Sequence, residues 1–202
     1  MSAMDVFLTL QQPQFAMPIV AATVIAIVLM RKPWTAAYVG LMPLINWSFS
    51  AVPTFPIPHW LGGGAFQPLA IVTGFVLVVR DFAQNEVKHW IFAAMAAGLV
   101  LSSLTSWIQV VVASGAAFLI SESVDWAVYT FVKRPLSERV LLSSVFSAPL
   151  DQIVFIFLAS FVVPGIFAFG TVMTGILSKL FGAYVVSQVM AAHERRTEMK
   201  PA

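Results

Sequence analysis

Long apolar runs, separated by short polar segments, dominate the hydropathy pattern of this chain. The runs are continuously apolar and do not alternate with polar residues, which favours transmembrane helices over the strands of a membrane barrel. We predict spans at residues 15–30, 35–52, 65–79, 90–106, 107–132, 140–163 and 166–190. This pattern predicts an all-α fold, a polytopic membrane helical bundle with seven spans.

The basic residues between the runs predict the orientation of the bundle. They fall in alternate connections or in the tail, as Arg31, Lys32, Arg80, Lys88, Lys133, Arg134, Arg139, Arg195, Arg196 and Lys200. The opposite connections, near 53–64, 103–107 and 163–165, carry none. Because basic connections stay on the cytoplasmic side, the N-terminus is predicted outside and the C-terminus inside.

Two boundaries in this scheme rest on charged residues. The third span is expected to stop at Arg80-Asp81, and the polar segment 191–202 is expected to form a disordered cytoplasmic tail. The first basic pair, Arg31-Lys32, follows the first apolar run, so that run is not expected to be a cleaved signal peptide.

Composition supports one integral membrane domain over residues 1–202. Of these residues 59% are hydrophobic and 10% are charged, with a mean hydropathy of +0.89, whereas soluble domains carry about 25% charged residues. The chain has no cysteine, which excludes disulfides and thiolate metal sites.

Two acids interrupt the fifth predicted span. Glu122 and Asp125 are three residues apart and therefore share one helix face. Charged groups inside a bilayer are costly, so they normally face a bundle interior and mark a substrate or ion path. The alternative is an interhelical polar clamp. Proton coupling through either acid is a hypothesis that this pattern allows.

A third acid, Asp151, lies in the sixth span on a face rich in small residues. Ser144, Ser147 and Ala148 share that face. Pro149 removes one helical hydrogen bond and can open a carbonyl toward a cavity. A serine-lined packing face with a proline kink is the structural alternative.

The seventh span contains the only lysine inside an apolar run, Lys179. At about 1.5 Å per helical residue, Lys179 and the three acids all lie near the middle of a hydrocarbon core about 30 Å thick. Lys179 could neutralise Asp151 or Asp125, or contact a ligand carbonyl. It shares its predicted face with Thr171, Gly175 and Gly182.

Other chemistry is sparse. Asn46 and Gln67 are intramembrane amides that could contact a ligand or join helices, the second being the more common role. The three histidines are far apart in sequence, and Gly62-Gly63-Gly64 does not continue as a P-loop. We therefore expect no enzyme, no cofactor and no metal site.

Two stretches in the fifth and sixth spans resemble a known family. ASGAAFLISESVDWAVYTFVKR and SSVFSAPLDQIVFIFLASF are similar to the queuosine-precursor transporter family, also called the vitamin uptake transporter family. Glu122, Asp125 and Asp151 occupy the acidic positions of its motifs, and Lys179 fits a lysine in its last helix. Arg80 and the segment GAFQPLAIV fit its earlier helix.

The chain also departs from this family in two ways. Family members usually carry an acid in the third span, where this chain reads TGFVLVV, with Asp81 only after it. They commonly have six spans, so residues 15–30 would be an added N-terminal span before a six-span transporter core at 35–190.

The resemblance implies import of a queuosine precursor, a 7-deazaguanine such as preQ0 or preQ1, across the bacterial inner membrane. A carboxylate can accept the N–H and NH2 donors of the base edge together, and aromatic side chains can stack on the ring. The candidate substrate-binding residues are Glu122, Asp125, Asp151, Lys179, Asn46, Gln67, Phe118, Trp126, Tyr129 and Phe146. We expect the 7-deazapurine base and the lipid bilayer as partners and no nucleic acid; a homo-oligomer stays open.

Two alternatives belong to other classes. A substrate-binding subunit that needs an ATP-driven partner would suit the size of the chain. A retinal-binding protein would suit seven spans and Lys179, but the third predicted span has no counter-ion acid, and Gly175 stands where an aspartate would be needed.

Overall fold

The computed structural model describes residues 3–133 and 135–198, and the chain folds into two compact units. Unit 1 comprises Met1–Pro53 and Val79–Gly115, and unit 2 comprises Thr54–Val78 and Ala116–Ala202. The unit boundaries fall inside two continuous helices, α4 (Ala70–Val87) and α6 (Ile108–Phe131), so the last part of α4 and the first part of α6 belong to unit 1.

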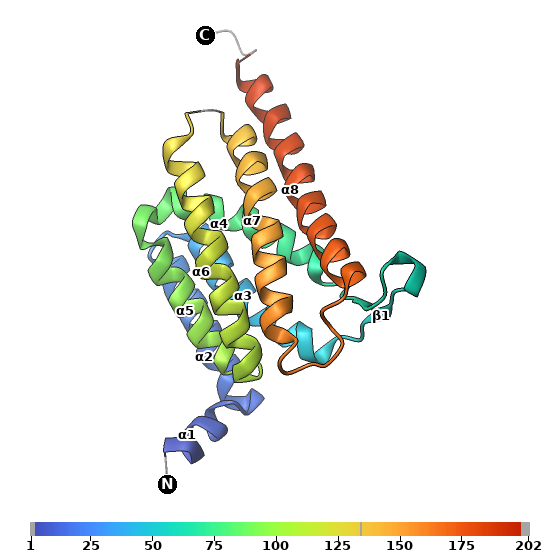
Figure 1. Ribbon diagram of the computed structural model, residues 1–202. Helices are drawn as coiled ribbons and strands as arrows, with labels where there is room; N and C mark the ends of the chain where they lie inside the picture. The colour runs from blue at the N-terminus through green and yellow to red at the C-terminus, as the bar shows by residue number, and fades with distance from the viewer. Residues whose placement is uncertain (1–2, 134, 199–202) are drawn as a thin grey trace. The chain divides into compact units, whose positions relative to one another are not determined.

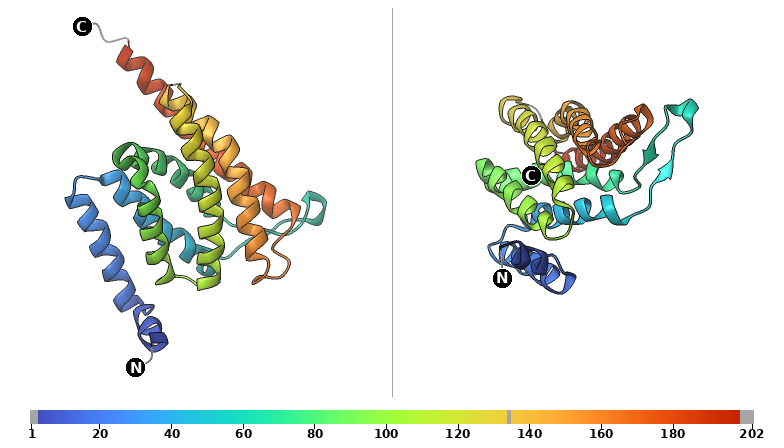
Figure 2. Two further views of the ribbon diagram at one scale, coloured as in Figure 1. Left: turned by 60° about the vertical axis from the view of Figure 1, so that its left-hand side comes forward. Right: turned by 60° about the horizontal axis from the view of Figure 1, so that its bottom comes forward.

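Every regular element among the described residues of unit 1 is a helix. Its remaining elements are α1 (Ala3–Leu10), α2 (Pro13–Leu29), α3 (Pro33–Ala51), the 3₁₀ helix η2 (Lys88–Trp90) and α5 (Ile91–Ser103). Helix α3 packs against both α2 and α5 (Figures 1 and 2), and a core of Ala16, Val39, Leu101 and Leu104 holds the three together. The short helix α1, which the apolar pattern did not predict, is bent by 74° from α2.

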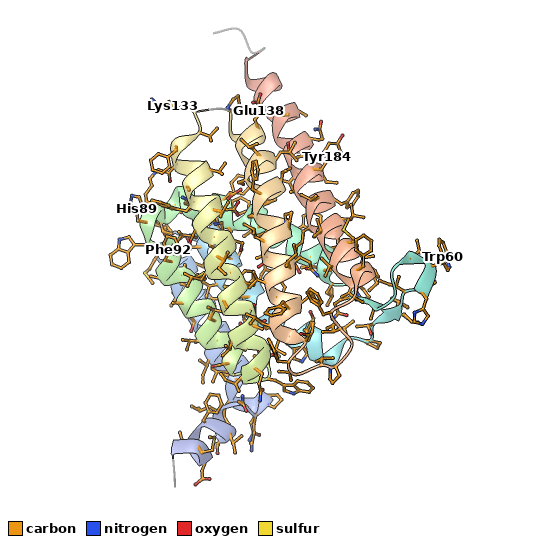
Figure 3. The ribbon with its side chains drawn as sticks, in the orientation of Figure 1. Trp60, His89, Phe92, Lys133, Glu138 and Tyr184 are labelled. Carbon is orange, nitrogen blue, oxygen red and sulfur yellow. The ribbon has the colours of Figure 1, made fainter. Side chains whose placement is uncertain are left out.

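Unit 2 is built on three long helices and a small hairpin. It contains most of α6, α7 (Leu136–Ala159) and α8 (Phe169–Glu198), of which α7 and α8 lie side by side in every view (Figures 1 and 2). The exposed residues Lys133 and Glu138 stand at the connection between α6 and α7 (Figure 3). Lys133 is one of the three basic residues predicted near this connection, whereas Arg134 and the side chain of Arg139 lie outside the described residues.

The hairpin precedes α4 in the chain. Strands β1 (Phe55–Pro56) and β2 (Ala65–Phe66) pair antiparallel, and the 3₁₀ helix η1 (His59–Leu61) lies between them, with the 82% exposed Trp60 at its tip (Figure 3). Gly62, Gly63 and Gly64 all have positive φ, between 65° and 95°, which explains why glycine occupies this return. The hairpin docks on the start of α8, because the Ala65 amide donates to Thr171 Oγ1 at 2.9 Å.

Each of the seven predicted spans corresponds to a helix, from α2 to α8. Not all of these helices are long and apolar enough to count as a membrane span. Among the described residues, three helices are long and apolar enough to cross a membrane, with candidate spans at Ile108–Val128, Leu141–Ala159 and Phe169–Val189. The bent pair α1–α2 would make a fourth. The helical bundle is thus confirmed, whereas seven spans and their orientation stay a prediction.

The helix of the third predicted span does not end at Arg80-Asp81. Helix α4 continues through Arg80-Asp81 to Val87, and both charged residues are buried, at 0% and 1% exposed. Arg80 Nη1 lies 2.7 Å from Asp81 Oδ1. The two charges neutralise each other, so the helix does not have to end at them. Arg80 therefore lies in a helix and not in a loop, and α4, the helix of the third predicted span, carries an acid, Asp81.

The expected disorder of the tail is also corrected. Helix α8 continues past the predicted span, through residues 191–198, to Glu198. A helix needs no apolar environment to satisfy its backbone hydrogen bonds, so it can extend beyond the apolar run that begins it. Residues 199–202 lie outside the described part of the chain.

Candidate functional site

The two acids of α6 lie on its buried face. Glu122 is 2% exposed and Asp125 is 1% exposed, and the same face buries Phe118 and Ser121. Spacings of three and four residues bring these side chains into line, and the shared face of Glu122 and Asp125 is the one that the sequence predicted. Helix α6 therefore presents two carboxylates to protein and not to the surroundings.

An ion pair joins α7 to α8. Lys179 Nζ lies 2.5 Å from Asp151 Oδ2, with the two side chains only 3% and 4% exposed. Ser121 Oγ of α6 lies 3.5 Å from the other carboxylate oxygen, Oδ1. Of the two partners predicted for Lys179, the structure shows Asp151. Asp151 thus connects the three long helices of unit 2.

Glycines allow α8 to place Lys179 close to its neighbours. A Cβ added at Gly74 of α4 would be 2.7 Å from the Lys179 carbonyl oxygen and 2.8 Å from its Cα. Gly182 packs in the same way against the Gly74 backbone, where an added Cβ would be 3.1 Å from the Gly74 Cα. Thr171, Gly175, Lys179 and Gly182 all lie on the buried face of α8, as predicted.

Gly175 has a separate role one turn before Lys179. A Cβ there would collide with the side-chain amide of Gln152, which is 6% exposed and follows Asp151 in α7. Gln152 is not among the residues that the sequence pattern indicates as candidates. The signal that could have found it is its position beside an intramembrane acid, on a helix whose other buried polar residues are serines.

The serine face of α7 is buried as predicted. Ser143, Ser144 and Ser147 are at most 1% exposed, and Asp151 continues their line. The Ser147 hydroxyl has no hydrogen-bond partner among the described residues. Pro149, inside the helix, has no amide hydrogen to donate to the Val145 carbonyl. This stretch of α7 therefore keeps polar groups that its own helix does not use.

The predicted aromatic residues are placed differently from one another. Phe118 is buried, at 4% exposed, on the face of the acids, whereas Phe146 is 54% exposed on α7. Trp126 is partly exposed and makes an edge-to-face contact with Phe131, with ring centroids 6.1 Å apart. The side chain of Tyr129 lies outside the described residues. The structure thus brings Phe118, but not Phe146, to the buried side of its helix.

The two predicted amides belong to different units. Asn46 of unit 1 is 2% exposed, and its Nδ2 donates to Ser102 Oγ at 3.0 Å and to the Met42 carbonyl at 3.2 Å. Gln67 of unit 2 is partly buried between β2 and α4. The contacts of Asn46 favour the interhelical role over the ligand role.

Sequence comparison places these helices in a known family. Residues 63–193, more than half of the chain, match the model of the family described as "Putative vitamin uptake transporter". The chain belongs to this family. The match covers β2 and every described helix from α4 to the greater part of α8, and so includes the ion pair and both α6 acids. No curated protein and no solved structure gives a significant match.

Family membership and the apolar helices identify a membrane transporter protein. Among the described residues of unit 2, the buried polar groups include two α6 carboxylates, the Asp151–Lys179 pair, the Gln152 amide and several hydroxyls. Such a set can accept and donate several hydrogen bonds to one small polar molecule. Among the described residues, no group of three or more His, Cys, Asp or Glu side chains is placed to hold a metal ion.

Proposed function

We propose that this transporter imports a queuosine precursor, a 7-deazaguanine such as preQ0 or preQ1. The observation that supports the proposal most is the set of buried acids on α6 and α7, inside the region that matches the family model. A buried carboxylate is costly unless it is paired or hydrogen-bonded, so a protein that keeps three of them has a use for them.

The chemistry of the base suits these acids. A guanine-like edge offers an N–H and an NH2 donor side by side, and one carboxylate can accept both. Asp125 and Asp151 are our candidates for this contact, with Glu122 beside them and Phe118 as the buried aromatic that can stack on the ring. A site of this kind rejects a ligand that leaves its buried polar groups unpaired.

The topology we propose has seven spans in the bacterial inner membrane, with the N-terminus outside. Helices α2 to α8 supply one helix for each span. The exclusion of Arg80 leaves the positive-inside pattern intact, because Arg31, Lys32, Lys88 and Lys133 still fall in alternate connections.

Uptake in a bacterial strain that neither makes nor imports queuosine precursors tests this function. Cells that express the chain are given preQ0 or preQ1, and queuosine in their tRNA is measured. We expect the parent chain to restore queuosine, and Asp125→Asn and Asp151→Asn to lower initial uptake by about 10- to 100-fold, as expected for lost hydrogen bonds to a charged group.

The matched control is Glu138→Gln, which makes the same change of acid to amide at an exposed position. It should transport like the parent chain. The amount of inserted, folded protein is measured for every variant. Folded parent protein that restores no queuosine would contradict the proposal. Rescue that depends on a co-purifying ATPase would instead identify the chain as the substrate-binding subunit of an ATP-driven transporter.

A further inference from the structure

The buried hydroxyl of Ser147 in unit 2 differs from four helix hydroxyls whose bonds the structure shows. Ser102, Ser121, Ser123 and Thr174 each donate to a carbonyl three or four residues earlier in their own helix. This local bond is the usual way for a serine or threonine to satisfy its hydroxyl inside a helix. Ser147 is 0% exposed, and its Oγ has no hydrogen-bond partner among the described residues.

Ser147 lies close in sequence to Asp151, one residue of the ion pair. Ser147 lies one turn before Asp151 on the buried face of α7, and Asp151 carries the ion pair with Lys179. Pro149 between them withholds the helical bond to the Val145 carbonyl. Since buried polar groups are almost always satisfied, an unused hydroxyl beside a charged pair indicates that a molecule from outside the chain supplies the partner.

We infer that Ser147 is a substrate-binding residue, whose hydroxyl hydrogen-bonds to the ligand beside the atoms held by Asp151. The inference rests on the proposed function for the identity of the ligand. Helix α7 then makes two polar contacts with the ligand, one through the Asp151 carboxylate and one through the Ser147 hydroxyl. The atom that Ser147 contacts is a hydrogen-bond acceptor on the ligand ring.

The chemistry of a 7-deazaguanine fits this pair of contacts. Its edge carries the two donors for a carboxylate, and an acceptor flanks them on each side, the ring carbonyl oxygen and the ring nitrogen N3. A carboxylate cannot serve these acceptors, whereas a hydroxyl one helical turn away can donate to one of them. A ligand that lacks the acceptor would leave the Ser147 hydroxyl unpaired and would bind less well.

The absence of cysteine from the chain allows a direct test. Ser147→Cys introduces a single thiol of nearly the same size, and its rate of modification by a small water-soluble thiol reagent is measured in membranes. Ser102→Cys is the matched control, because Ser102 is also 0% exposed but its hydroxyl both donates, to the Gly98 carbonyl, and accepts, from Asn46. We expect the thiol of the Ser147→Cys variant to be modified at least about tenfold faster than the thiol of the control, since a substrate-binding position must be reached by water during transport.

Two further arms use preQ0 as the probe. Saturating preQ0 should slow the modification of the Ser147→Cys variant, and Ser147→Ala should raise the Kd for preQ0 by about tenfold, the loss of one hydrogen bond. Ser102→Ala should leave that Kd unchanged in the folded protein. Two results would overturn the role of Ser147. One is a modification rate of Ser147→Cys equal to that of the control. The other is fast modification of Ser147→Cys that preQ0 does not slow, although the parent chain imports preQ0.

The arms separate the inference from the proposed function. If the parent chain imports no preQ0 but Ser147→Cys is modified fast, Ser147 lines the path of a different ligand and the proposed function fails. If the parent imports preQ0 and Ser147→Cys reacts like the control, the function stands and Ser147 is a packing residue. If the parent imports no preQ0 and Ser147→Cys reacts like the control, the proposed function and the role of Ser147 are both wrong.

Discussion

Each of the two units buries a layer of polar side chains between helices, and the two layers are built differently. In unit 1, Asn46 of α3 donates to Ser102 of α5, and Ser102 in turn donates to the Gly98 carbonyl. Every group in this chain of bonds is neutral, and each donor named has an acceptor within the unit. The layer between α7 and α8 holds a lysine and an aspartate instead, with the unused Ser147 hydroxyl nearby.

This difference separates two uses of polar residues inside a membrane protein. Neutral groups that satisfy one another join helices and need no ligand. Ionised groups are more costly to bury, and sites that keep them are usually functional. We therefore propose that the α3–α5 layer is a structural contact and that the α7–α8 layer takes part in transport.

The largest effect should come from breaking the ion pair on one side only. Lys179→Met leaves the Asp151 carboxylate buried without its counter-charge, and we expect a loss of about 3–5 kcal/mol of stability. The double variant Asp151→Asn/Lys179→Met removes both charges and should recover to within about 1 kcal/mol of the parent. The midpoint of thermal unfolding in detergent measures both.

The control and the transport assay complete this prediction. Lys133→Met removes an exposed lysine at the connection of α6 and α7 and should change stability by less than about 0.5 kcal/mol. The double variant should be folded but should transport at least about 10- to 100-fold more slowly than the parent, because Asp151 is gone. A double variant that transports at the parent rate would show that the pair serves stability alone.

The ion pair also shows which parts of the site the sequence could predict. The apolar runs predicted the helices, and spacing along α6, α7 and α8 placed Glu122, Asp125, Asp151 and Lys179 on faces that the structure buries. Spacing within one helix cannot say which acid Lys179 meets. That depends on how α7 and α8 are rotated against each other, which the contact of Gly175 with Gln152 helps to determine.

Single small or charged residues were harder to interpret from sequence. From sequence alone, Arg80-Asp81 indicates the end of a span, but the two charges pair with each other inside α4. Ser121 gave no signal, since a serine is common on packed helix faces. The Ser147 hydroxyl stands out because it makes no hydrogen bond among the described residues, and a missing bond cannot be seen in a sequence.

A smaller effect is expected from the glycines that bring helices together. Gly74→Ala would place a methyl group 2.7 Å from the Lys179 carbonyl oxygen, and backbone cannot move aside as a side chain can. We expect a loss of about 1–3 kcal/mol and weaker substrate binding, because α8 carries Lys179. Thermal unfolding and the Kd for preQ0 measure the two consequences.

The matched glycine in unit 1 is Gly98 of α5. The three atoms nearest to an added Cβ there all belong to the side chain of Met42, whose flexible Sδ end lies nearest and can move aside, and alanine favours a helix over glycine by about 1 kcal/mol. Gly98→Ala should therefore be close to neutral. Equal losses for the Gly74 and Gly98 variants would mean that the close approach of α4 and α8 has no special weight.

The smallest effect is expected in the α3–α5 layer. Asn46→Ala and Ser102→Ala each remove one side of a neutral interhelical hydrogen bond, and such bonds contribute about 0.6 kcal/mol on average in membrane proteins. A double-mutant cycle should give a coupling energy of that size between Asn46 and Ser102. Transport per folded molecule should stay at the parent value in all three variants, since no charge and no unused group is involved. Loss of transport in Asn46→Ala with stability intact would reverse the comparison, because it would make the unit 1 amide a substrate contact and not a link between helices.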